Sequence, residues 1–419
     1  MKSRTSNNLG FSKATASNGG SSTAHTASKF KQFFTGKFGA ALALCLSSGL
    51  VNAAALHVNC TNNVADTAAL RNTINGSAAG DQINIHGVCL VNQTIVLKGG
   101  RSYLGDIRTD GSATQIRQAN GANLPAVLAS DSWDNNTAWV GEPIRIAHLQ
   151  VDGNKANNAS GTVGIMVRSW LAVIEDVGVA KTSGDGIRIT NLSKNNTALT
   201  SSMVNGRISN VFIEDVNGSG INVVDTGNSI TDWDVIDTWI GTTGWHGIYL
   251  ANAAGWKVRG NHLYNIGRDA IYANRCWATT IDGNYIEDFG NAGASAANYG
   301  IACAMTTGNI ASTIIGNKVF MLKPLMNSTT YRYIGVPAIN YAGSATINVV
   351  DNVIVGNNTS TNNEAGLYYS TWCPCGGGTT LNVFSNNNVT NIAPNINPTT
   401  YQYSKYQPYG TLNYFSAGK

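Results

Sequence analysis

Residues 246–274, HGIYLANAAGWKVRGNHLYNIGRDAIYAN, contain one short phrase twice, and this repetition decides the fold. The phrase is Gly or Ala, then Ile, any residue and an apolar residue. It occurs as Gly247-Ile248-Tyr249-Leu250 and, 23 residues later, as Ala270-Ile271-Tyr272-Ala273. Alternating apolar residues bounded by Gly and Asn are typical of short strands and bends. Because no helix-length periodic segment separates the two copies, the pattern excludes a fold that alternates strands with helices.

The same phrase recurs along most of the chain, at a spacing that indicates a solenoid. Further copies begin at Gly164, Gly186, Gly220, Gly300, Ala338 and Gly366, and successive copies lie 22 to 38 residues apart. An Asn-x-apolar phrase lies between them at Asn261, Asn284, Asn317, Asn352 and Asn387. A minimal period of about 22 residues predicts one coil of a parallel β-solenoid, with coils stacked about 4.8 Å apart. We expect these Asn residues to be structural, since Asn tolerates sharp bends and can hydrogen-bond from coil to coil.

Charge is scarce in this chain and unevenly distributed. Only 12% of the 419 residues are charged, 46 are Gly, and the formal net charge is +4. The first 55 residues hold six basic side chains and no acidic one, so the remainder carries about −2. Nucleic-acid-binding domains carry a concentrated positive excess, so the composition excludes an electrostatic nucleic-acid binder. With 43% apolar residues, the chain can still bury a large core.

Residues 1–55 have the order of a cleaved secretory signal. Lysines at 29, 31 and 37 precede an apolar run from Phe38 to Val51, and Ala53, Ala54 and Ala55 follow it. The run is too short to cross a bilayer core of about 30 Å as a helix, although a retained membrane anchor is the alternative. Export predicts a secreted, extracellular or periplasmic protein without stable membrane insertion. It also makes the six remaining cysteines candidates for disulfides.

Two segments flank the repeats. Residues 66–74, DTAALRNTI, predict a short amphipathic helix with Asp66 as its N-cap, which would cover the open end of the solenoid. Beyond Ile392 the repeat fades into a tail rich in Tyr, Asn and Pro. We therefore predict a β-helix domain over residues 56–392 and a C-terminal tail, residues 393–419, that packs on the coils.

The segment DTAALRNTI, the following GDQINIHGVCLVNQTIVLKG (residues 80–99) and the coils resemble the secreted right-handed parallel β-helix proteins of the pectate-lyase superfamily. The resemblance covers roughly residues 57–392. It implies an all-β, single-stranded right-handed parallel β-helix that acts on carbohydrate, most often as a polysaccharide lyase or glycoside hydrolase. It also implies a site on one outward face. The motifs of polygalacturonases, alginate epimerases and calcium-dependent pectate lyases are not matched, so the subfamily stays open.

Aligning the coils on the repeated phrase places residues of equal offset above one another. Polar, titratable and aromatic residues concentrate in the coils between 186 and 275, and the alternative to a site there is a solvated flank with polar pairs between coils. We predict catalytic roles for His246, Asp269, Arg188, Tyr249, Arg268 and Lys181. We predict substrate contacts for Trp245, Tyr272, Asp185, Arg168, Asn222 and Asn274. An Asp beside an imidazole can orient it as a base, and aromatic rings can stack on sugars.

The same alignment predicts disulfides. Cys276 and Cys303 fall on consecutive coils and would brace the floor of the site, whereas Cys276 with Cys373 would cross three coils, about 14 Å. Cys60 with Cys89 would hold the start of the fold. Cys373 and Cys375 form a Cys-Pro-Cys turn that could close on itself. The Cys and His spacing does not predict a zinc site, and metal dependence stays open, although Ca²⁺ is common in lyases of the resembling fold.

Three functions fit this face. A lyase needs a cation to neutralise a uronate carboxylate, a base and an acid; Arg188 or Arg268, His246 or Lys181, and Tyr249 supply them. A glycoside hydrolase needs two carboxyl groups roughly 5 to 9.5 Å apart.

For the hydrolase, Asp185 and Asp269 lie three coils apart, about 14 Å, and fit poorly. Asp185 with Asp215, or Asp269 with a loop acid, stays open. A non-catalytic glycan-binding adhesin needs only the aromatic and Asn faces. We favour the lyase over the hydrolase, and either enzyme over the adhesin.

Overall fold

The structure is a computed structural model that describes residues 53–106, 114–159, 161–293, 297–308, 311–325, 329–357, 363–375, 377–392, 401–402 and 410–416. The predicted secretory signal therefore lies outside the described residues, apart from its last three alanines. Residues 53 onward form one compact unit by themselves.

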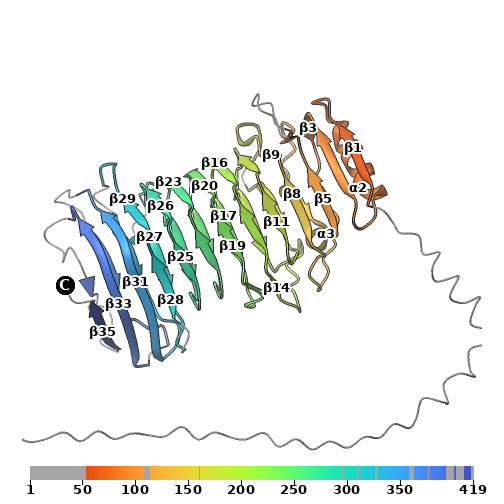
Figure 1. Ribbon diagram of the computed structural model, residues 1–419. Helices are drawn as coiled ribbons and strands as arrows, with labels where there is room; N and C mark the ends of the chain where they lie inside the picture. The colour runs from red at the N-terminus through yellow and green to blue at the C-terminus, as the bar shows by residue number, and fades with distance from the viewer. Residues whose placement is uncertain are drawn as a thin grey trace, which may run out of the picture. The chain divides into compact units, whose positions relative to one another are not determined.

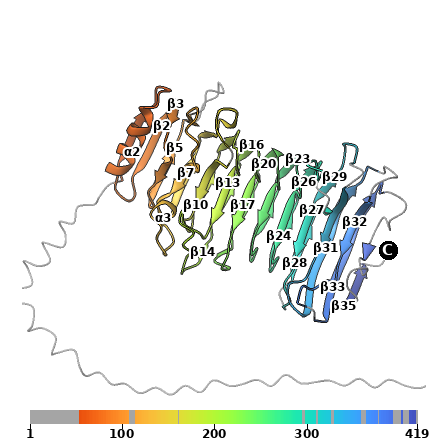
Figure 2. The ribbon, with the colours of Figure 1, turned by 180° about the vertical axis from the view of Figure 1, so that it is seen from behind.

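This unit is a parallel β-helix in which each coil contributes three strands to three stacks (Figures 1 and 2). The first stack comprises β1 (Ala55–Asn59), β2 (Gln82–His86), β5 (Arg101–Leu104), β8 (Ile144–Ala147), β11 (Val173–Glu175), β15 (Arg207–Ser209), β19 (Asp234–Ile236), β22 (Lys257–Arg259), β25 (Thr280–Asp282), β28 (Ser312–Ile315), β31 (Gly343–Val355), β33 (Thr379–Thr390) and β35 (Gly410–Ser416). The second comprises β3 (Val88–Val91), β6 (Gln115–Gln118), β9 (Gln150–Asp152), β12 (Gly178–Ala180), β16 (Phe212–Val216), β20 (Trp239–Thr243), β23 (His262–Ile266), β26 (Tyr285–Glu287) and β29 (Lys318–Phe320). The long strands β31 and β33 continue from the first stack into the second and join the two.

The third stack is a separate eleven-stranded sheet, seen in Figure 2. It comprises β4 (Ile95–Leu97), β7 (Ala126–Ser130), β10 (Val163–Val167), β13 (Ile187–Thr190), β17 (Ile221–Val224), β21 (Ile248–Leu250), β24 (Ile271–Asn274), β27 (Ala297–Ala304), β30 (Thr330–Val336), β32 (Asn363–Tyr369) and β34 (Tyr401–Gln402). Outside the stacks lie α2 (Asp66–Gly76), α3 (Asp131–Asp134), a 3-10 turn at Lys155–Asn157, and the pair β14 (Met203–Val204) and β18 (Ile230–Thr231).

The repeated phrase supplies the strands of the eleven-stranded sheet. Ile221, Ile248 and Ile271 are in register on β17, β21 and β24, and their side chains are fully buried. Inward apolar residues of all three stacks form one continuous core from Val58 to Ile392. The solenoid predicted from the spacing is therefore confirmed.

One copy of the phrase does not form the expected strand. The repeat predicts a strand at Ala338-Ile339, but the register pairs Ile301 with Ile334, and Ile334 with Leu367. Ile339 instead pairs with Met305, beyond the end of β30. In the other coils, a Gly or Ala precedes the inward residue of this strand. Tyr333, whose ring is fully buried, takes that position here, so this coil does not contain the repeated phrase.

The recurring Asn residues form a buried ladder at the bend between the first and second stacks. Within it, Oδ1 of Asn317 accepts hydrogen bonds from the backbone N–H and Nδ2 of Asn284, both at 2.9 Å. Nδ2 of Asn317 donates to Oδ1 of Asn352 at 2.9 Å and to the carbonyl of Ile281 at 3.0 Å. The series runs from Asn261 to Asn387, which confirms that these residues are structural.

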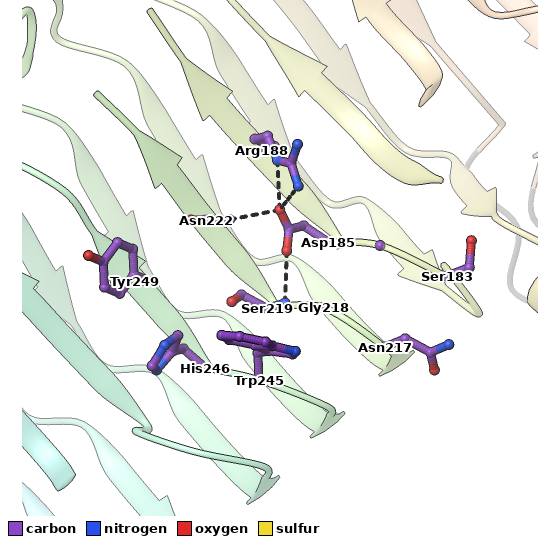
Figure 3. A pocket seen from close by; sticks show the side chains of 11 residues that line it. Ser183, Asp185, Arg188, Asn217, Gly218, Ser219, Asn222, Trp245, His246 and Tyr249 are labelled. Carbon is purple, nitrogen blue, oxygen red and sulfur yellow. Dashed lines mark hydrogen bonds and ion pairs between the residues drawn. The ribbon is translucent and has the colours of Figure 1, made fainter. Parts of the chain in front are cut away.

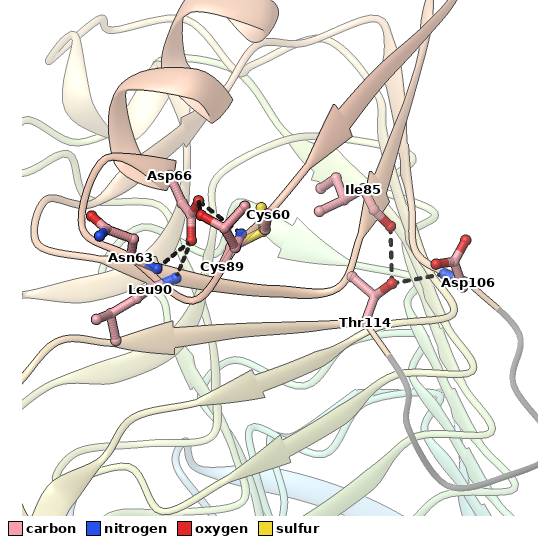
Figure 4. Close-up of a disulfide and its surroundings, with 9 residues drawn as sticks. Cys60, Asn63, Asp66, Ile85, Cys89, Leu90, Asp106 and Thr114 are labelled. Atoms are coloured by element: carbon pink, nitrogen blue, oxygen red, sulfur yellow. Dashed lines mark hydrogen bonds between the residues drawn. A yellow bond between two sulfur atoms is a disulfide. The ribbon is translucent and has the colours of Figure 1, made fainter.

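The N-terminal helix covers the first coils, with one correction at its start (Figure 4). Helix α2 buries Leu70 and Ile74 against them, as predicted for a cap. Asp66 is its first helical residue rather than its N-cap. Its carboxylate accepts hydrogen bonds from the backbone N–H groups of Thr61, Asn63 and Leu90. These amides precede the helix or belong to the next coil, so Asp66 ties the helix to its surroundings instead of capping it.

Both predicted long-range disulfides are present. Cys60 is bonded to Cys89 beside α2 (Figure 4). Cys276 is bonded to Cys303 of β27, one coil further along, and a third disulfide closes the Cys373–Cys375 turn.

The described parts of the C-terminal tail extend the sheets. β34 pairs with β32, and β35 pairs with β33 in parallel. These segments therefore add a further coil, whereas residues 393–400, where the predicted domain boundary falls, lie outside the described residues.

We expect Asn317→Ala to lower the free energy of unfolding by about 3 kcal/mol, because it leaves buried donors and acceptors of Asn284 and Ile281 without partners. Urea unfolding followed by circular dichroism measures the loss. Asn195→Ala, at an exposed Asn outside the ladder, is the matched control. An equal, small loss in both variants would contradict a stabilising role of the ladder.

Candidate functional site

A cleft of about 490 Å³ lies on the outer side of the eleven-stranded sheet, around the amino ends of β13, β17 and β21 (Figure 3). Register places Arg188, Asn222, Tyr249 and Tyr272 side by side on β13, β17, β21 and β24. The cleft is lined by Ser183, Gly184, Asp185, Arg188, Asn217, Gly218, Ser219, Asn222, Trp245, His246 and Tyr249. Six of the predicted site residues are therefore among its walls.

Asp185 and Arg188 form a fixed ion pair in the cleft. Asp185 is only 4% exposed, and its Oδ2 accepts from Nε of Arg188 at 2.7 Å and lies 2.6 Å from Nη2. The same oxygen accepts from Nδ2 of Asn222 at 2.8 Å, while Oδ1 accepts from the backbone N–H of Ser219 at 2.9 Å. These contacts hold the half-buried guanidinium of Arg188 in one place at the cleft wall.

His246 is paired with Asp269 of the next coil. Nδ1 of His246 lies 3.1 Å from Oδ2 of Asp269, close enough for a charge interaction but not aligned as a hydrogen bond. Asp269 is itself fixed, because its Oδ1 accepts from the backbone N–H of Tyr299 at 2.6 Å. Nδ1 is the ring nitrogen that faces the carboxylate. The coil alignment predicted this neighbourhood.

Tyr249 and Tyr272 stack beside the imidazole. Their ring centres are 5.6 Å apart, and that of Tyr249 lies 5.1 Å from that of His246. Burial raises the pKa of Tyr249, helped by the negative charge of Asp269 and opposed by a hydrogen bond from Asn274. Burial, with Asp269 and Tyr249 adding to it, raises the pKa of Tyr272 to about 12. Both phenols are therefore protonated at neutral pH, so they can donate a proton rather than remove one.

Trp245 and Arg268 form an exposed aromatic and cationic edge. The guanidinium of Arg268 lies 3.8 Å from the ring centre of Trp245. Trp245 is 49% exposed, so part of its indole ring is accessible to a ligand. A cation over an indole is an attractive arrangement of about 0.5–1 kcal/mol at exposed sites, and it keeps both groups beside the cleft.

Six predicted site residues are not among the walls of the cleft. Four of them contact residues that are: Asp269, Tyr272, Arg268 and Asn274. The other two, Lys181 and Arg168, lie elsewhere. Lys181 lines a separate depression together with Lys155 and Asp215. Arg168, a predicted substrate contact, is fully buried, and its guanidinium donates to the carbonyls of Asn191, Ser132 and Thr197. Its role in this structure is to hold loops together. The offset alone placed it on the outer face, because the loops that enclose it leave no mark in the repeat.

Several residues of the site are not marked by the repeat. Ser183, Asn217 and Ser219 line the cleft from the bends before β13 and β17. Arg332 shares the column of His246 and Asp269, because it pairs with Tyr299 in register. The repeated phrase placed this coil at Ala338, so it did not predict that Arg332 occupies this position. A cation therefore also occupies this offset beyond residue 275. The side chain of Arg332 is 5% exposed, and its guanidinium lies 4.8 Å from the ring centre of Tyr368.

Two further kinds of feature were considered for the described part of the chain: membrane-spanning helices and metal sites. No helix there is long and apolar enough to span a bilayer. No group of three His, Cys, Asp or Glu side chains there is placed to hold a metal ion. In the cleft itself, the carboxylate of Asp185 is engaged by Arg188.

Comparisons with solved structures bear on the fold. The sequence matches no family model and no curated protein. The A-module of the mannuronan C-5 epimerase AlgE4 of Azotobacter vinelandii is similar at 13% identity and a TM-score of 0.58, over 86% of this chain and 96% of that one. The AlgE6 A-module of the same organism is similar at 14% identity and a TM-score of 0.50, over 84% of this chain and 96% of that one. Tailspike protein 2 of an Escherichia coli O157:H7 bacteriophage is similar at 16% identity and a TM-score of 0.51, over 87% of this chain and 46% of that one.

These likenesses and the strand topology establish the class of the protein. It is an all-β, right-handed parallel β-helix, as the resemblance predicted. Identities this low show the fold alone, and the subfamily stays open.

We expect the raised pKa of Tyr272 to appear as a loss of stability at alkaline pH. The phenol ionises near pH 10 in the unfolded chain but only near 12 in the folded protein, so unfolding becomes more favourable as pH rises from 10 towards 12. Relative to the wild type, Tyr272→Phe should gain about 2 kcal/mol over this window. Denaturant unfolding at several pH values measures it.

The control is Tyr341→Phe, which removes a phenol that is 62% exposed. A stability difference for Tyr272→Phe that stays constant with pH would show that this phenol does not resist ionisation.

Proposed function

We propose that the protein is an exported enzyme that cleaves a polysaccharide containing uronic acid by β-elimination, with this cleft as its active site. The observation that carries the proposal is the convergence in one cleft of a fixed cation, Arg188, an imidazole paired with a carboxylate, His246, and a protonated phenol, Tyr249. These are the three groups that elimination next to a uronate carboxylate requires.

In this proposal, each of the three groups has one role. Arg188 binds the sugar carboxylate and stabilises the charge that develops on it, because its guanidinium keeps unused donors beyond those given to Asp185. Nε2 of His246 removes the C5 proton, and Asp269 supports the resulting imidazolium. A double bond forms between C4 and C5 as the C4–O bond breaks, and Tyr249 protonates the departing oxygen. Transfer of the proton from His246 to Tyr249, directly or through water, restores the site.

The surrounding side chains suit a saccharide. Trp245 offers an exposed aromatic face, and Asn217 and Asn222 offer amides to sugar hydroxyls. The similar epimerases bear names that state a uronate polymer, mannuronan, as their substrate. For this chain, that likeness supports a glycan substrate class as a proposal and does not decide the reaction.

A hydrolase has weaker support. Asp185 is the only carboxylate among the residues that line the cleft, and it is engaged by Arg188. Asp215, the partner that the sequence left open for Asp185, lines the separate depression, and its Oδ1 lies 2.8 Å from Nζ of Lys155. Asp269 lies three coils from Asp185. The two carboxyl groups that hydrolysis requires are therefore not assembled here.

The disulfides and the predicted signal support export. An extracellular or periplasmic location is thus part of the same proposal, since a polymer substrate lies outside the cell.

His246→Ala should lower kcat by at least about a hundredfold, because it removes the base, while the melting temperature stays within a few degrees of the wild type. Turnover is followed by the ultraviolet absorbance of the unsaturated product. His262→Gln, on β23 of another stack, is the control and should retain activity. A His246→Ala protein that melts much lower would show a structural role instead.

The reaction class is tested on a panel of uronate polymers. Unsaturated product supports elimination. New reducing ends without that absorbance would replace it with hydrolysis. Binding without either product would leave a glycan-binding adhesin.

A further inference from the structure

A second depression, of about 320 Å³, lies at the opposite ends of the strands of the eleven-stranded sheet. The first cleft surrounds the amino ends of β13, β17 and β21, whereas this depression follows the carboxyl ends of β17 to β30. It is lined by Asn228, Asn252, Arg275, Trp277, Thr306, Thr307 and Tyr341. The proposed reaction uses none of these residues.

The depression has the chemistry of an acidic-sugar site. Arg275 is the only charged residue in its lining, and the rest are aromatic, amide or hydroxyl side chains. Tyr341 is 62% exposed, and the guanidinium of Arg275 lies 5.1 Å from the ring centre of Trp277. Aromatic faces stack on sugar rings, and guanidinium groups bind carboxylates through paired hydrogen bonds.

Among the described residues, no acidic side chain neutralises the cation here. Within the described ranges, Arg275 makes no ion pair with an acidic side chain, and neither its Nη1 nor Nε1 of Trp277 has a hydrogen-bond partner. Buried donors normally have a partner. The separate depression around Lys181 differs because two carboxylates, Asp152 and Asp215, line it together with its cations, and Lys155 is paired with Asp215.

The two recesses are close enough for one polymer chain. Tyr249 lines the first and Asn252 the second, and these residues are three apart on the same coil, so at most about 10 Å separates them along the chain. Asn274, which hydrogen-bonds Tyr249, directly precedes Arg275. A chain held at the first cleft that crosses the carboxyl edge of the sheet reaches the second.

We propose that this depression is a second, non-catalytic subsite that binds a carboxylate-bearing sugar unit of the polymer held in the cleft. The inference rests on the proposed uronate substrate and deepens it. Arg275 binds the carboxylate, Tyr341 stacks on the ring, and the amides and hydroxyls bind neighbouring hydroxyl groups. The subsite therefore favours long acidic chains over short or neutral ones.

Binding is tested first, without turnover. In the His246→Ala background, calorimetry measures the affinity for soluble polygalacturonate and for alginate, with dextran as the neutral polymer. We expect Arg275→Gln to weaken binding to at least one of the acidic polymers about tenfold, and Tyr341→Ala to weaken it by a similar factor. Arg259→Gln is the matched control, because Arg259 is largely exposed and pairs with Asp282 on the first stack. Unchanged affinity in Arg275→Gln, or an equal loss in Arg259→Gln, would overturn the subsite.

Kinetics provide the second readout. On whichever of the two polymers the wild type degrades, Arg275→Gln should raise KM about tenfold with kcat within twofold, and it should raise KM for short oligosaccharides much less. An equal effect on both lengths would contradict a distal subsite.

The two proposals fail separately. If Arg275→Gln weakens the binding of an acidic polymer but the wild type gives no unsaturated product, the elimination mechanism is removed and the subsite is kept. Elimination by the wild type, with no effect of Arg275→Gln on binding or KM, would do the reverse.

Discussion

The structure depends on parallel pairing between coils at a fixed register. In the middle of the eleven-stranded sheet, neighbouring strands meet with isoleucine opposite isoleucine, as at Ile221, Ile248 and Ile271. A slip by one residue would turn every inward side chain outward. The Asn ladder opposes such a slip at the bend, because each amide bonds the equivalent amide of the next coil and a carbonyl of the coil before. Buried networks in which every group is satisfied specify one arrangement.

The same register produces the site. Residues that are distant in sequence, such as His246 and Asp269, become neighbours because they occupy the same offset on adjacent coils. Loops then leave the coil without changing the register, which explains how intervals of 22 to 34 residues between equivalent positions preserve one face. A solenoid can thus vary its side chains one coil at a time while its core remains unchanged.

The sequence predicted the fold and much of the cleft because both follow from this periodicity. Alternation and the Gly-Ile phrase mark inward and outward positions, so the repeat alone is enough to place His246, Tyr249 and Tyr272 together. Periodicity fails where a side chain departs from the repeat. Tyr333 fills the position of a small residue and hides the true strand, and with it Arg332. Arg168 has an outward offset but is enclosed by loops. These departures depend on tertiary packing that no repeat encodes.

Two aspartates at the same offset bind both the backbone of the next coil and a side chain of the cleft. Asp185 and Asp269 occupy the same offset, and each uses Oδ1 to accept the backbone N–H of the equivalent residue one coil further, Ser219 and Tyr299. This bond satisfies an amide at the bend and fixes the orientation of the buried carboxylate. Oδ2 is then left to face a basic side chain of the cleft, Arg188 in one case and His246 in the other. Burying a carboxylate is costly unless it is paired and hydrogen-bonded, and both conditions are met twice by the same local arrangement. A single structural device, repeated three coils apart, therefore fixes the cation at one place and orients the imidazole at another.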